Sequence, residues 1–187
     1  MLAAACILLS LITEIKKYRL FQAILIVILS VEYILITAYQ SEAAKLDRYT
    51  YDTAYSHITV SERSDIKTLK NIRDLQIDNI THAGMFLEDN ELVYDYTRYY
   101  HLHDVLFPES KNILMFGGAA YSYPKSFLET YEDKTLDVVE IDKDITQIAK
   151  KHFRLIDDPR LSIYHQDARV FLNTSEKKYD AILGDAF

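Results

Sequence analysis

The stretch ILMFGGAAYS at residues 113–122 decides the fold of this chain. Its first four residues form an unbroken apolar run, which is typical of a strand buried on both faces of a parallel sheet. Gly117 and Gly118 follow the run directly, and Pro124 suits the first turn of a helix that continues to about Tyr131. A buried strand, a glycine turn and a helix in this order predict the first unit of a βαβ fold.

The same alternation continues downstream. Further strands are expected at 136–141, 161–164 and 179–183, and apolar residues on one face predict a helix over 144–153. Strands that alternate with helices imply a parallel sheet with right-handed crossovers. We therefore expect residues 89–187 to form an incomplete Rossmann-like nucleoside-binding domain, whose last strand would be an exposed edge.

A small antiparallel β-domain is expected over residues 54–88, before the parallel sheet. Polar and apolar residues alternate at 55–60, and a second run at 68–77 leads into the turn pair Asp78-Asn79. Residues 80–86 then form the returning strand. Together these three runs predict a small antiparallel sheet before the main domain.

Two further segments flank this β-domain. Residues 90–107 predict a helix that is capped by Asp89 or Asn90 and ended by Pro108. Its tyrosine-rich face is more typical of core packing than of a binding site. Residues 41–53 are polar and mixed in charge, so we expect a linker there.

The N-terminal segment, residues 1–40, is expected to associate with a membrane. Residues 20–39 (LFQAILIVILSVEYILITAY) contain no Lys or Arg, and 20 helical residues span about 30 Å, the thickness of the bilayer's hydrocarbon core. They predict a transmembrane helix with Tyr33 and Tyr39 near one interface. The apolar run at 2–13 would span only about 18 Å, so it is the end of a longer helix, an interfacial segment or a start-site artefact.

The orientation of this anchor is ambiguous in the sequence. The basic turn at 16–19 favours the cytoplasm, which would place the domain after the helix outside. A nucleoside made in the cytosol favours the opposite arrangement, and we expect a cytoplasmic catalytic face at the cell membrane. Glu32 within the span should face protein rather than lipid, which implies partner helices besides the lipid bilayer.

Charge and cysteine content exclude several classes of function. The net charge is −7, and residues 41–187 alone hold 18 basic and 26 acidic residues. An acidic domain without a basic stripe argues against nucleic acid as a partner. The single cysteine, Cys6, rules out an internal disulfide or a multi-cysteine metal site. The six histidines have no metal-ligand spacing, so we expect no metal.

Candidate functional residues lie at the carboxyl ends of the predicted strands, where open parallel sheets bind ligands. Gly117 and Gly118 would let the backbone approach a ligand closely. Glu140 follows Gly117 by 23 residues, near the spacing at which an acidic side chain binds ribose hydroxyls. Asp167 and Asp185 end the next two strands. A structural alternative is that such carboxylates only cap the helices that follow them.

These residues stand in motifs that resemble the spermidine synthase family, most closely its membrane-fused branch. The motifs are ILMFGGAAYS at 113–122, VVEID at 138–142, DDPRL at 157–161, HQDAR at 165–169 and YDAILGD at 179–185, with YSHI at 55–58, LQIDN at 75–79 and ELVY at 91–94 upstream. The resemblance covers about residues 50–187 and implies a parallel sheet of the S-adenosylmethionine-dependent methyltransferase type. It also implies a C-terminal truncation relative to the family.

The resemblance implies a role for each matching residue. Glu140 would hold the ribose hydroxyls of the co-substrate, decarboxylated S-adenosylmethionine or S-adenosylmethionine, and Asp167 would accept from its adenine amino group. Asp185 would deprotonate and hold the attacking amine, and Tyr94 would lie near that amine. The partners would be a small-molecule amine and this adenosine-type co-substrate. The expected reaction is aminopropyl transfer, in which a carboxylate base suits an ammonium nucleophile.

Four positions depart from the family pattern. Ala120 stands where the family has the aspartate that binds the amino group of the co-substrate, and Ser56 and His82 replace two glutamines. Tyr96 replaces a glutamate. These changes remove contacts to the aminopropyl end and leave the adenosine contacts. Three alternatives therefore remain open: a nucleoside-binding membrane protein that has lost catalysis, a methyltransferase that uses S-adenosylmethionine, and a purely structural membrane-tethered domain that binds no ligand.

Overall fold

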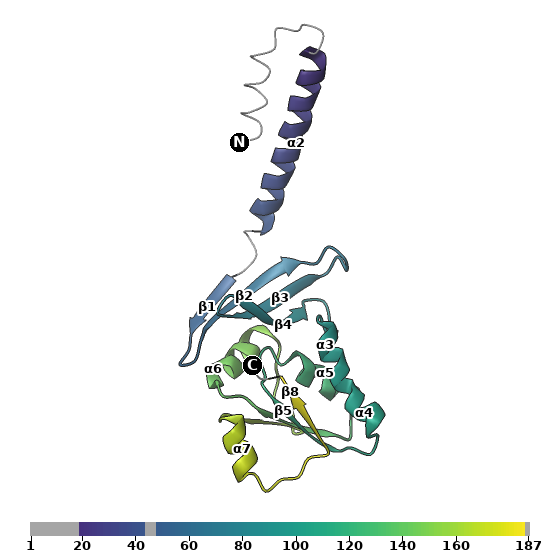
Figure 1. The fold of residues 1–187 in the computed structure, drawn as a ribbon, viewed down its shortest axis with the longest axis vertical. Coiled ribbons are helices and arrows are strands. Elements are labelled where there is room, and N and C mark those ends of the chain that lie inside the picture. Colours follow the sequence, from purple (N-terminus) through teal and green to yellow (C-terminus); the bar gives the residue numbers. More distant parts are fainter. Residues whose placement is uncertain (1–18, 44–47, 186–187) are drawn as a thin grey trace. The chain divides into compact units, whose positions relative to one another are not determined.

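The computed structural model describes residues 19–43 and 48–185 (Figure 1). The chain divides into two compact units, Met1–Leu46 and Asp47–Phe187, which are described separately. The apolar run at 2–13 with Cys6, and most of the basic turn at 16–19, lie outside the described residues.

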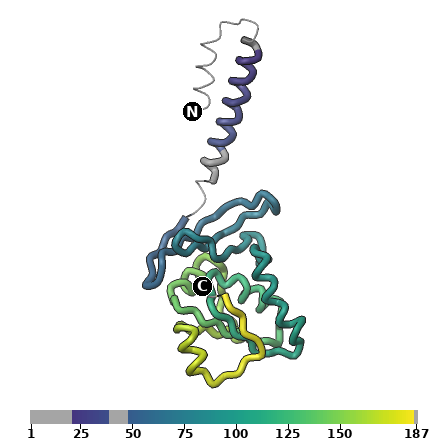
Figure 2. The backbone as a smooth tube through the Cα atoms, viewed as in Figure 1, coloured from purple at the N-terminus to yellow at the C-terminus, as the bar shows by residue number. Residues whose placement is uncertain are grey.

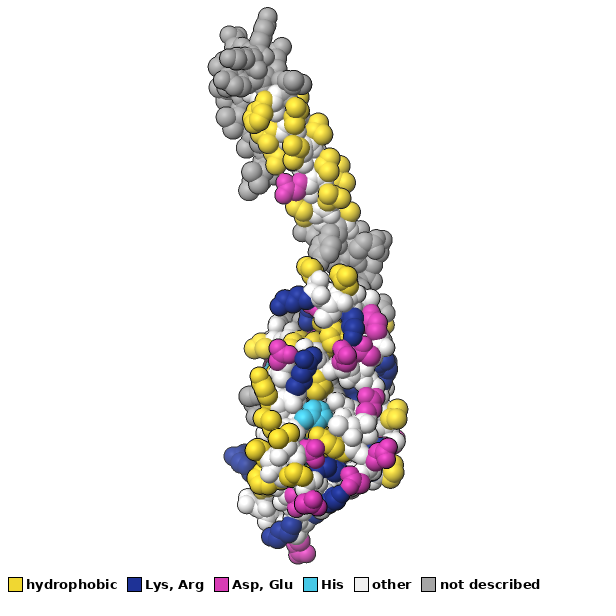
Figure 3. Space-filling model, turned by 90° about the vertical axis from the view of Figure 1, so that its right-hand side faces the viewer, with side chains coloured by type: hydrophobic (Ala, Val, Ile, Leu, Met, Phe, Trp, Pro, Cys, Tyr) yellow, Lys and Arg dark blue, Asp and Glu magenta, His cyan; other side chains and the backbone are white. Residues whose placement is uncertain are grey.

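The first unit contains helix α2, Arg19–Ala43, which confirms the helix predicted over residues 20–39. The segment Phe21–Ala38 is long and apolar enough to cross a membrane by length and composition, a criterion that a signal sequence near the N-terminus also meets. Apolar side chains cover the helix surface seen in Figure 3, which contrasts with the mixed charges on the second unit. Glu32 is exposed within this apolar helix.

The second unit begins with a four-stranded antiparallel sheet in the order β1-β2-β3-β4. Its strands are β1 Arg48–Asp52, β2 His57–Ser64, β3 Asn71–Ile77 and β4 Ile80–Phe86. The predicted antiparallel sheet is therefore confirmed, but it starts earlier than expected. The prediction of a linker over 41–53 is wrong at β1, which pairs with β2 from Arg48↔Ser61 to Asp52↔His57. This edge strand is mostly exposed, so its polar sequence resembled a linker.

The predicted turn between β3 and β4 is confirmed. Asp78 and Asn79 both have positive φ, 49° and 68°. A two-residue hairpin turn of type I′, whose twist matches that of the flanking strands, requires positive φ at both of its central residues. Asp and Asn tolerate this left-handed conformation better than most residues because their short side chains bond locally. The Asp78 Oδ1 atom accepts from the His57 backbone N–H at 3.0 Å, which ties the turn to the start of β2.

A parallel sheet in the order β7-β6-β5-β8 follows, as predicted. Its strands are β5 Asn112–Phe116, β6 Thr135–Val139, β7 Leu161–Tyr164 and β8 Ala181–Gly184, and its helices are α5 Ser122–Thr130, α6 Lys143–His152 and α7 Ala168–Thr174. Figure 2 shows the last strand returning beside β5, so segments about 70 residues apart become neighbours. This crossover brings the end of β8 next to the glycine turn.

The two faces of the parallel sheet are buried against different partners. Ile113 and Met115 of β5 belong to the main core, which also contains apolar side chains of α5, α6 and the antiparallel sheet. Leu114 points to the opposite face, where it packs in a smaller cluster with Val139 and with Phe171 of α7. The antiparallel sheet thus shares the main core with the parallel sheet, and residues 47–187 form one compact unit rather than the two predicted domains.

The helix predicted over 90–107 is wrong at its N-terminal end. The helical residues are α3 Asp95–Arg98, η2 Tyr99–His101 and α4 Leu102–Leu106. Leu92 forms an isolated antiparallel bridge with Met85 and is buried, so the β-sheet captures this segment before the helix begins. The expected cap, Asp89, instead pairs with Lys70 at 2.6 Å. Tertiary pairing has overridden the local signal for a helix start.

Candidate functional site

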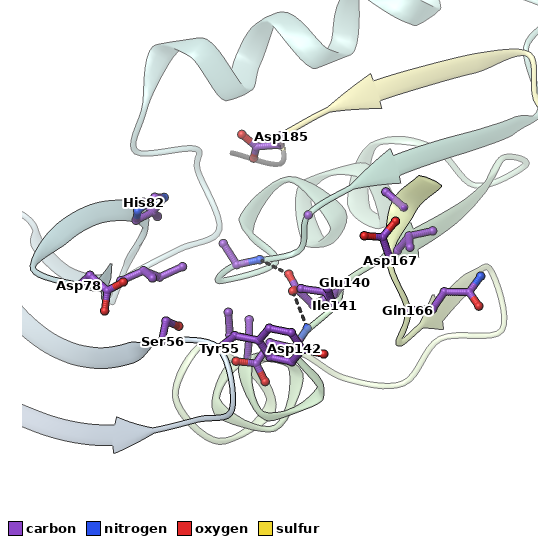
Figure 4. Close-up of a pocket in the computed structure, with 16 residues that line it drawn as sticks. Tyr55, Ser56, Asp78, His82, Glu140, Ile141, Asp142, Gln166, Asp167 and Asp185 are labelled. Carbon is purple, nitrogen blue, oxygen red and sulfur yellow. Dashed lines mark hydrogen bonds between the residues drawn. The ribbon is translucent and has the colours of Figure 1, made fainter. Parts of the chain in front are cut away.

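A cavity of about 510 Å³ lies at the carboxyl ends of the parallel strands (Figure 4). Gly117, Glu140, Asp167 and Asp185, which come from four different strand ends, all line it. The sequence-based rule that ligand residues gather at this edge therefore located the cavity correctly. The remaining candidates, Gly118 and Tyr94, line a second and smaller cavity that also includes Asp185.

Glu140 is held at the centre of the site by the backbone. Its side chain is buried, and Oε2 accepts hydrogen bonds from the N–H groups of Gly118 at 2.8 Å and Ala119 at 3.4 Å. Oε1 accepts from the Asp142 N–H at 3.0 Å. A carboxylate has about four acceptor positions, so Oε1 retains one for a ligand hydroxyl, and the second position on Oε2 is occupied only by the long bond from Ala119. The two oxygens are therefore fixed at a spacing suited to a vicinal diol.

The glycine turn brings the backbone close to this carboxylate. Gly117 has a φ of 85°, and its N–H donates to the Val139 carbonyl at 2.9 Å, which joins the ends of β5 and β6. Gly118 lies against the ring of Tyr121, a fully buried side chain whose hydroxyl bonds Thr146 at 2.8 Å. A Cβ added at Gly118 would lie 2.4 Å from the Tyr121 ring. This close packing requires glycine at position 118.

We expect Gly118→Ala to lower the free energy of unfolding by about 1–3 kcal/mol, because the Tyr121 ring cannot move without disturbing the core. Gly184→Ala is the matched control, since nothing lies within 4 Å of a Cβ built at Gly184. Urea denaturation of the full chain in detergent compares the two variants. Equal unfolding midpoints for both variants would contradict this account of the glycine turn.

Asp185 follows β8 and lies between the two cavities. Its backbone N–H donates to the Phe116 carbonyl at 2.9 Å, which fixes it beside β5. Burial raises the pKa of the Asp185 carboxyl, while the Tyr100 hydroxyl and His82 act in the opposite direction. The Tyr100 hydroxyl also donates to the Gly184 carbonyl at 3.3 Å. A partly desolvated carboxylate of this kind is a stronger proton acceptor than an exposed one.

Asp167 has a structural role in addition to its place at the cavity. Its Oδ1 accepts from the N–H groups of Arg169 at 2.8 Å and Val170 at 3.2 Å, so it caps α7. Hydrogen bonds from Arg169 lower the pKa of the Asp167 carboxyl, which stays ionised at neutral pH. Asp167 therefore caps the helix that follows it, as the structural alternative for these carboxylates predicted. A carboxylate used in this way can still accept a further hydrogen bond from a ligand.

Several residues that line the cavity were not assigned a role from the sequence. Asp78 and His82 come from the antiparallel sheet and face the parallel sheet across the cavity in Figure 4. Gln166 and Asp142 follow β7 and β6. Asp142 caps α6 through Oδ1, and its Oδ2 is buried without a hydrogen-bond partner among the described residues. Asp78 lies in the motif LQIDN at 75–79 and Asp142 in the motif VVEID at 138–142. Their acidic side chains in these motifs were the signal by which the sequence could have identified them.

The positions that depart from the family pattern divide between core and cavity. Ala120 is fully buried, so it packs in the core and presents no polar group to a ligand. Ser56 and His82 line the large cavity. Tyr96 lines the small cavity, and its hydroxyl donates to the His82 carbonyl at 3.2 Å.

The large cavity is strongly acidic. Five carboxylates line it, and among its described lining residues none is Lys or Arg; the carboxylates are Asp78, Glu140, Asp142, Asp167 and Asp185. Such a surface attracts a cationic ligand and disfavours an anionic one. Within residues 19–43 and 48–185, no group of three or more His, Cys, Asp or Glu could hold a metal ion. The charge of the cavity therefore suits a cationic ligand.

Comparisons with known proteins agree with this geometry. The family model described as the spermine/spermidine synthase domain matches residues 78–187. A polyamine aminopropyltransferase from Vibrio vulnificus (strain CMCP6) is 34% identical over 137 residues, which cover 71% of this chain and 46% of that protein. The chain thus spans about half the length of the curated relatives it matches.

Solved structures show the same fold. A probable spermidine synthase from Corynebacterium glutamicum ATCC 13032 superposes with a TM-score of 0.63 at 21% identity, covering 75% of this chain and 52% of that one. A spermidine synthase in complex with the transition-state analogue AdoDATO gives 0.61 at 21% identity, with 74% and 46% covered. With a matching family model over more than half of its length, the chain belongs to the spermine/spermidine synthase family.

Proposed function

We propose that this protein transfers the aminopropyl group of decarboxylated S-adenosylmethionine to an amine. The acidity of the large cavity carries the proposal, because this co-substrate is a sulfonium and an ammonium with no carboxylate. Ordinary S-adenosylmethionine adds a negative charge, and no basic side chain lines the described cavity to receive it. The methyltransferase alternative is therefore not favoured.

The reaction needs one base and one leaving group. The amine nitrogen attacks the propyl carbon bonded to the sulfonium sulfur, a C–N bond forms and the C–S bond breaks with its electron pair going to sulfur. Neutral methylthioadenosine leaves, and the proton of the attacking nitrogen passes to the Asp185 carboxylate. Asp185 suits this step because burial makes it a better base.

The other candidate residues bind the donor in this proposal. Glu140 accepts hydrogen bonds from the ribose hydroxyls, one at the free position of Oε1 and one at Oε2 in place of the long bond from Ala119. The turn at Gly117 and Gly118 allows close approach of the backbone. Asp167 accepts from the adenine amino group, and Tyr94 lies at the amine side of Asp185. A catalytically lapsed binding protein is less favoured because Asp185 and Glu140 are both retained.

We propose a membrane location for the same protein. Helix α2 is long and apolar enough to span the bilayer, and apolar side chains are exposed along it. The lipid bilayer is its proposed partner, with other membrane helices near Glu32. Because the co-substrate is made in the cytosol, the proposed catalytic face is cytoplasmic.

Isothermal titration calorimetry tests the donor. We expect decarboxylated S-adenosylmethionine to bind at least about tenfold more tightly than S-adenosylmethionine, since the extra carboxylate meets uncompensated acidic groups. Both this chain and a form extended to the length of the relatives are titrated in detergent, with methylthioadenosine as the uncharged control. Tighter binding of S-adenosylmethionine, or no binding of any adenosine compound to either form, would overturn the proposal.

A further inference from the structure

The loop between β2 and β3 (Figure 1) exposes two large apolar side chains. Ile66 is 78% exposed and Leu69 is 87% exposed, and no other large apolar side chain within residues 48–185 is more exposed than these two. Lys67, which is also exposed, lies between them in the sequence. Single exposed apolar residues are common on protein surfaces, whereas grouped ones are typical of interaction surfaces.

Hydrogen bonds within the loop hold it in one conformation. The Asp65 N–H donates to the Lys70 carbonyl at 2.8 Å, and the Leu69 N–H donates to the Asp65 carbonyl at 2.8 Å. The Asp65 Oδ2 atom accepts from the Thr68 N–H at 2.9 Å and from the Thr68 hydroxyl at 2.6 Å. The N–H groups of residues 65, 68 and 69 are thus satisfied inside the loop, which lowers the free-energy cost of moving it into an apolar environment.

Leu69 has a left-handed backbone conformation, with a φ of 58°. This conformation is unfavourable for a large side chain, and glycine, asparagine or aspartate usually adopts it. The Leu69 side chain is almost fully exposed, so packing within the loop does not compensate for this cost. The leucine therefore indicates a partner that takes up apolar side chains.

The loop lies at the end of the antiparallel sheet where β1 begins. Arg48, the first residue of β1, pairs with Ser61, which is three residues, or about 10 Å, before the end of β2 at Ser64. Five residue steps join Ala43, the last residue of α2, to Arg48, and such a connection can span at most about 18 Å. A short connection thus ties this end of the sheet to the helix for which we have suggested a membrane location.

We propose that the β2–β3 loop inserts Ile66 and Leu69 into the interface of the bilayer that α2 would cross, with Lys67 directed to the lipid phosphates. The inference rests on the membrane location suggested above and is independent of the reaction. Apolar side chains gain free energy when they leave water for the boundary between headgroups and acyl chains, and a lysine stem can reach from there to the headgroups. A second attachment besides α2 would restrict rotation of residues 48–185 at the membrane surface.

Labels at the two ends of the antiparallel sheet test this proposal. Cys6, the only cysteine of the chain, is replaced by serine, and one new cysteine is introduced by Leu69→Cys or by Ile80→Cys. Ile80 is the matched control, because it is 65% exposed and pairs with Ile77 at the end of the sheet opposite the β2–β3 loop. The full chain is reconstituted in vesicles of phosphatidylcholine and phosphatidylglycerol, and each cysteine carries a polarity-sensitive fluorophore.

We expect the label at position 69 to emit at a shorter wavelength than the label at position 80, and to lose at least about twofold more fluorescence to a quencher on the acyl chains. A water-soluble quencher should act in the reverse order. Equal quenching of both labels from water would overturn the proposal. So would a position-69 label that is shielded from both quenchers, because protein then covers the loop. A chain that does not float with the vesicles would remove the membrane location itself.

Leu69→Asn measures whether the leucine serves the fold. Asparagine tolerates the left-handed backbone, so we expect this variant to unfold at the same or a higher urea concentration than the wild type in detergent. A lower unfolding midpoint would mean that Leu69 stabilises the fold, and the reason for assigning it to the bilayer would be lost.

Discussion

Asp185→Asn is expected to lower kcat for aminopropyl transfer by about 10²–10⁴-fold, the range typical for loss of a general base. The amide has nearly the shape of the carboxylate but cannot take the proton from the attacking nitrogen. Donor affinity should change little, because Glu140 and Asp167 supply the proposed adenosine contacts. Single-turnover release of methylthioadenosine measures the rate, and calorimetry measures the donor affinity in the same preparation.

The same substitution, which lowers kcat, is not expected to lower the stability of the fold at neutral pH. The folded-state pKa of Asp185 is raised above its unfolded value, so its contribution to stability is full below the unfolded pKa and is lost as pH rises through the folded pKa. At neutral pH the ionised carboxylate therefore opposes folding. The asparagine amide carries no such charge, and we expect the D185N chain to be at least as stable as wild type at pH 7. A large loss of stability in this variant would mean that Asp185 is a structural residue.

Glu140→Ala is expected to weaken donor binding by about 30- to 1000-fold, which corresponds to about 2–4 kcal/mol for two lost hydrogen bonds to a charged acceptor. The variant also leaves the N–H groups of Gly118 and Asp142 without their acceptor, so a moderate loss of stability should accompany it. Calorimetry with decarboxylated S-adenosylmethionine measures the affinity. Urea denaturation reports the second effect independently.

Asp167→Ala is the matched control for this prediction, because it removes a carboxylate that lines the same cavity but is largely occupied by its helix and Arg169. We expect a smaller loss of donor affinity there, about tenfold or less, since one hydrogen bond is at stake. If the two variants bind the donor equally well, the cavity lacks a dominant ribose contact, and the role assigned to Glu140 is wrong.

The parallel sheet could be predicted because its signals are local and strong. Residues 113–116 are continuously apolar, and Gly117-Gly118 ends the strand where the structure also ends it. The start of the helix near residue 90 could not be predicted, because Leu92 pairs with Met85 through a contact that only the folded chain brings together. Strand β1 was missed for a related reason: an exposed edge strand needs little apolar sequence, and its partner β2 supplies the hydrogen bonds.

The candidate site also contains residues that could be predicted from the sequence and residues that could not. Glu140 and Asp185 followed from the rule that ligands bind at the carboxyl ends of parallel strands, so their shared cavity was foreseeable. Asp78 and His82 approach that cavity from the antiparallel sheet, and no spacing in the sequence specifies how the two sheets pack. The resemblance placed Tyr94 near the amine, and in the structure Tyr94 lines the small cavity together with Asp185 and donates its hydroxyl hydrogen bond to Asp74.

The internal contacts of Glu140 also have a kinetic consequence. Three backbone N–H groups of the same chain orient its carboxylate, so that orientation does not depend on a nucleoside. A preorganised acceptor gives up little rotamer entropy when a ribose arrives. Binding of a nucleoside should therefore require no rotation of the Glu140 side chain, and differences in affinity among nucleosides should appear chiefly in how fast they leave.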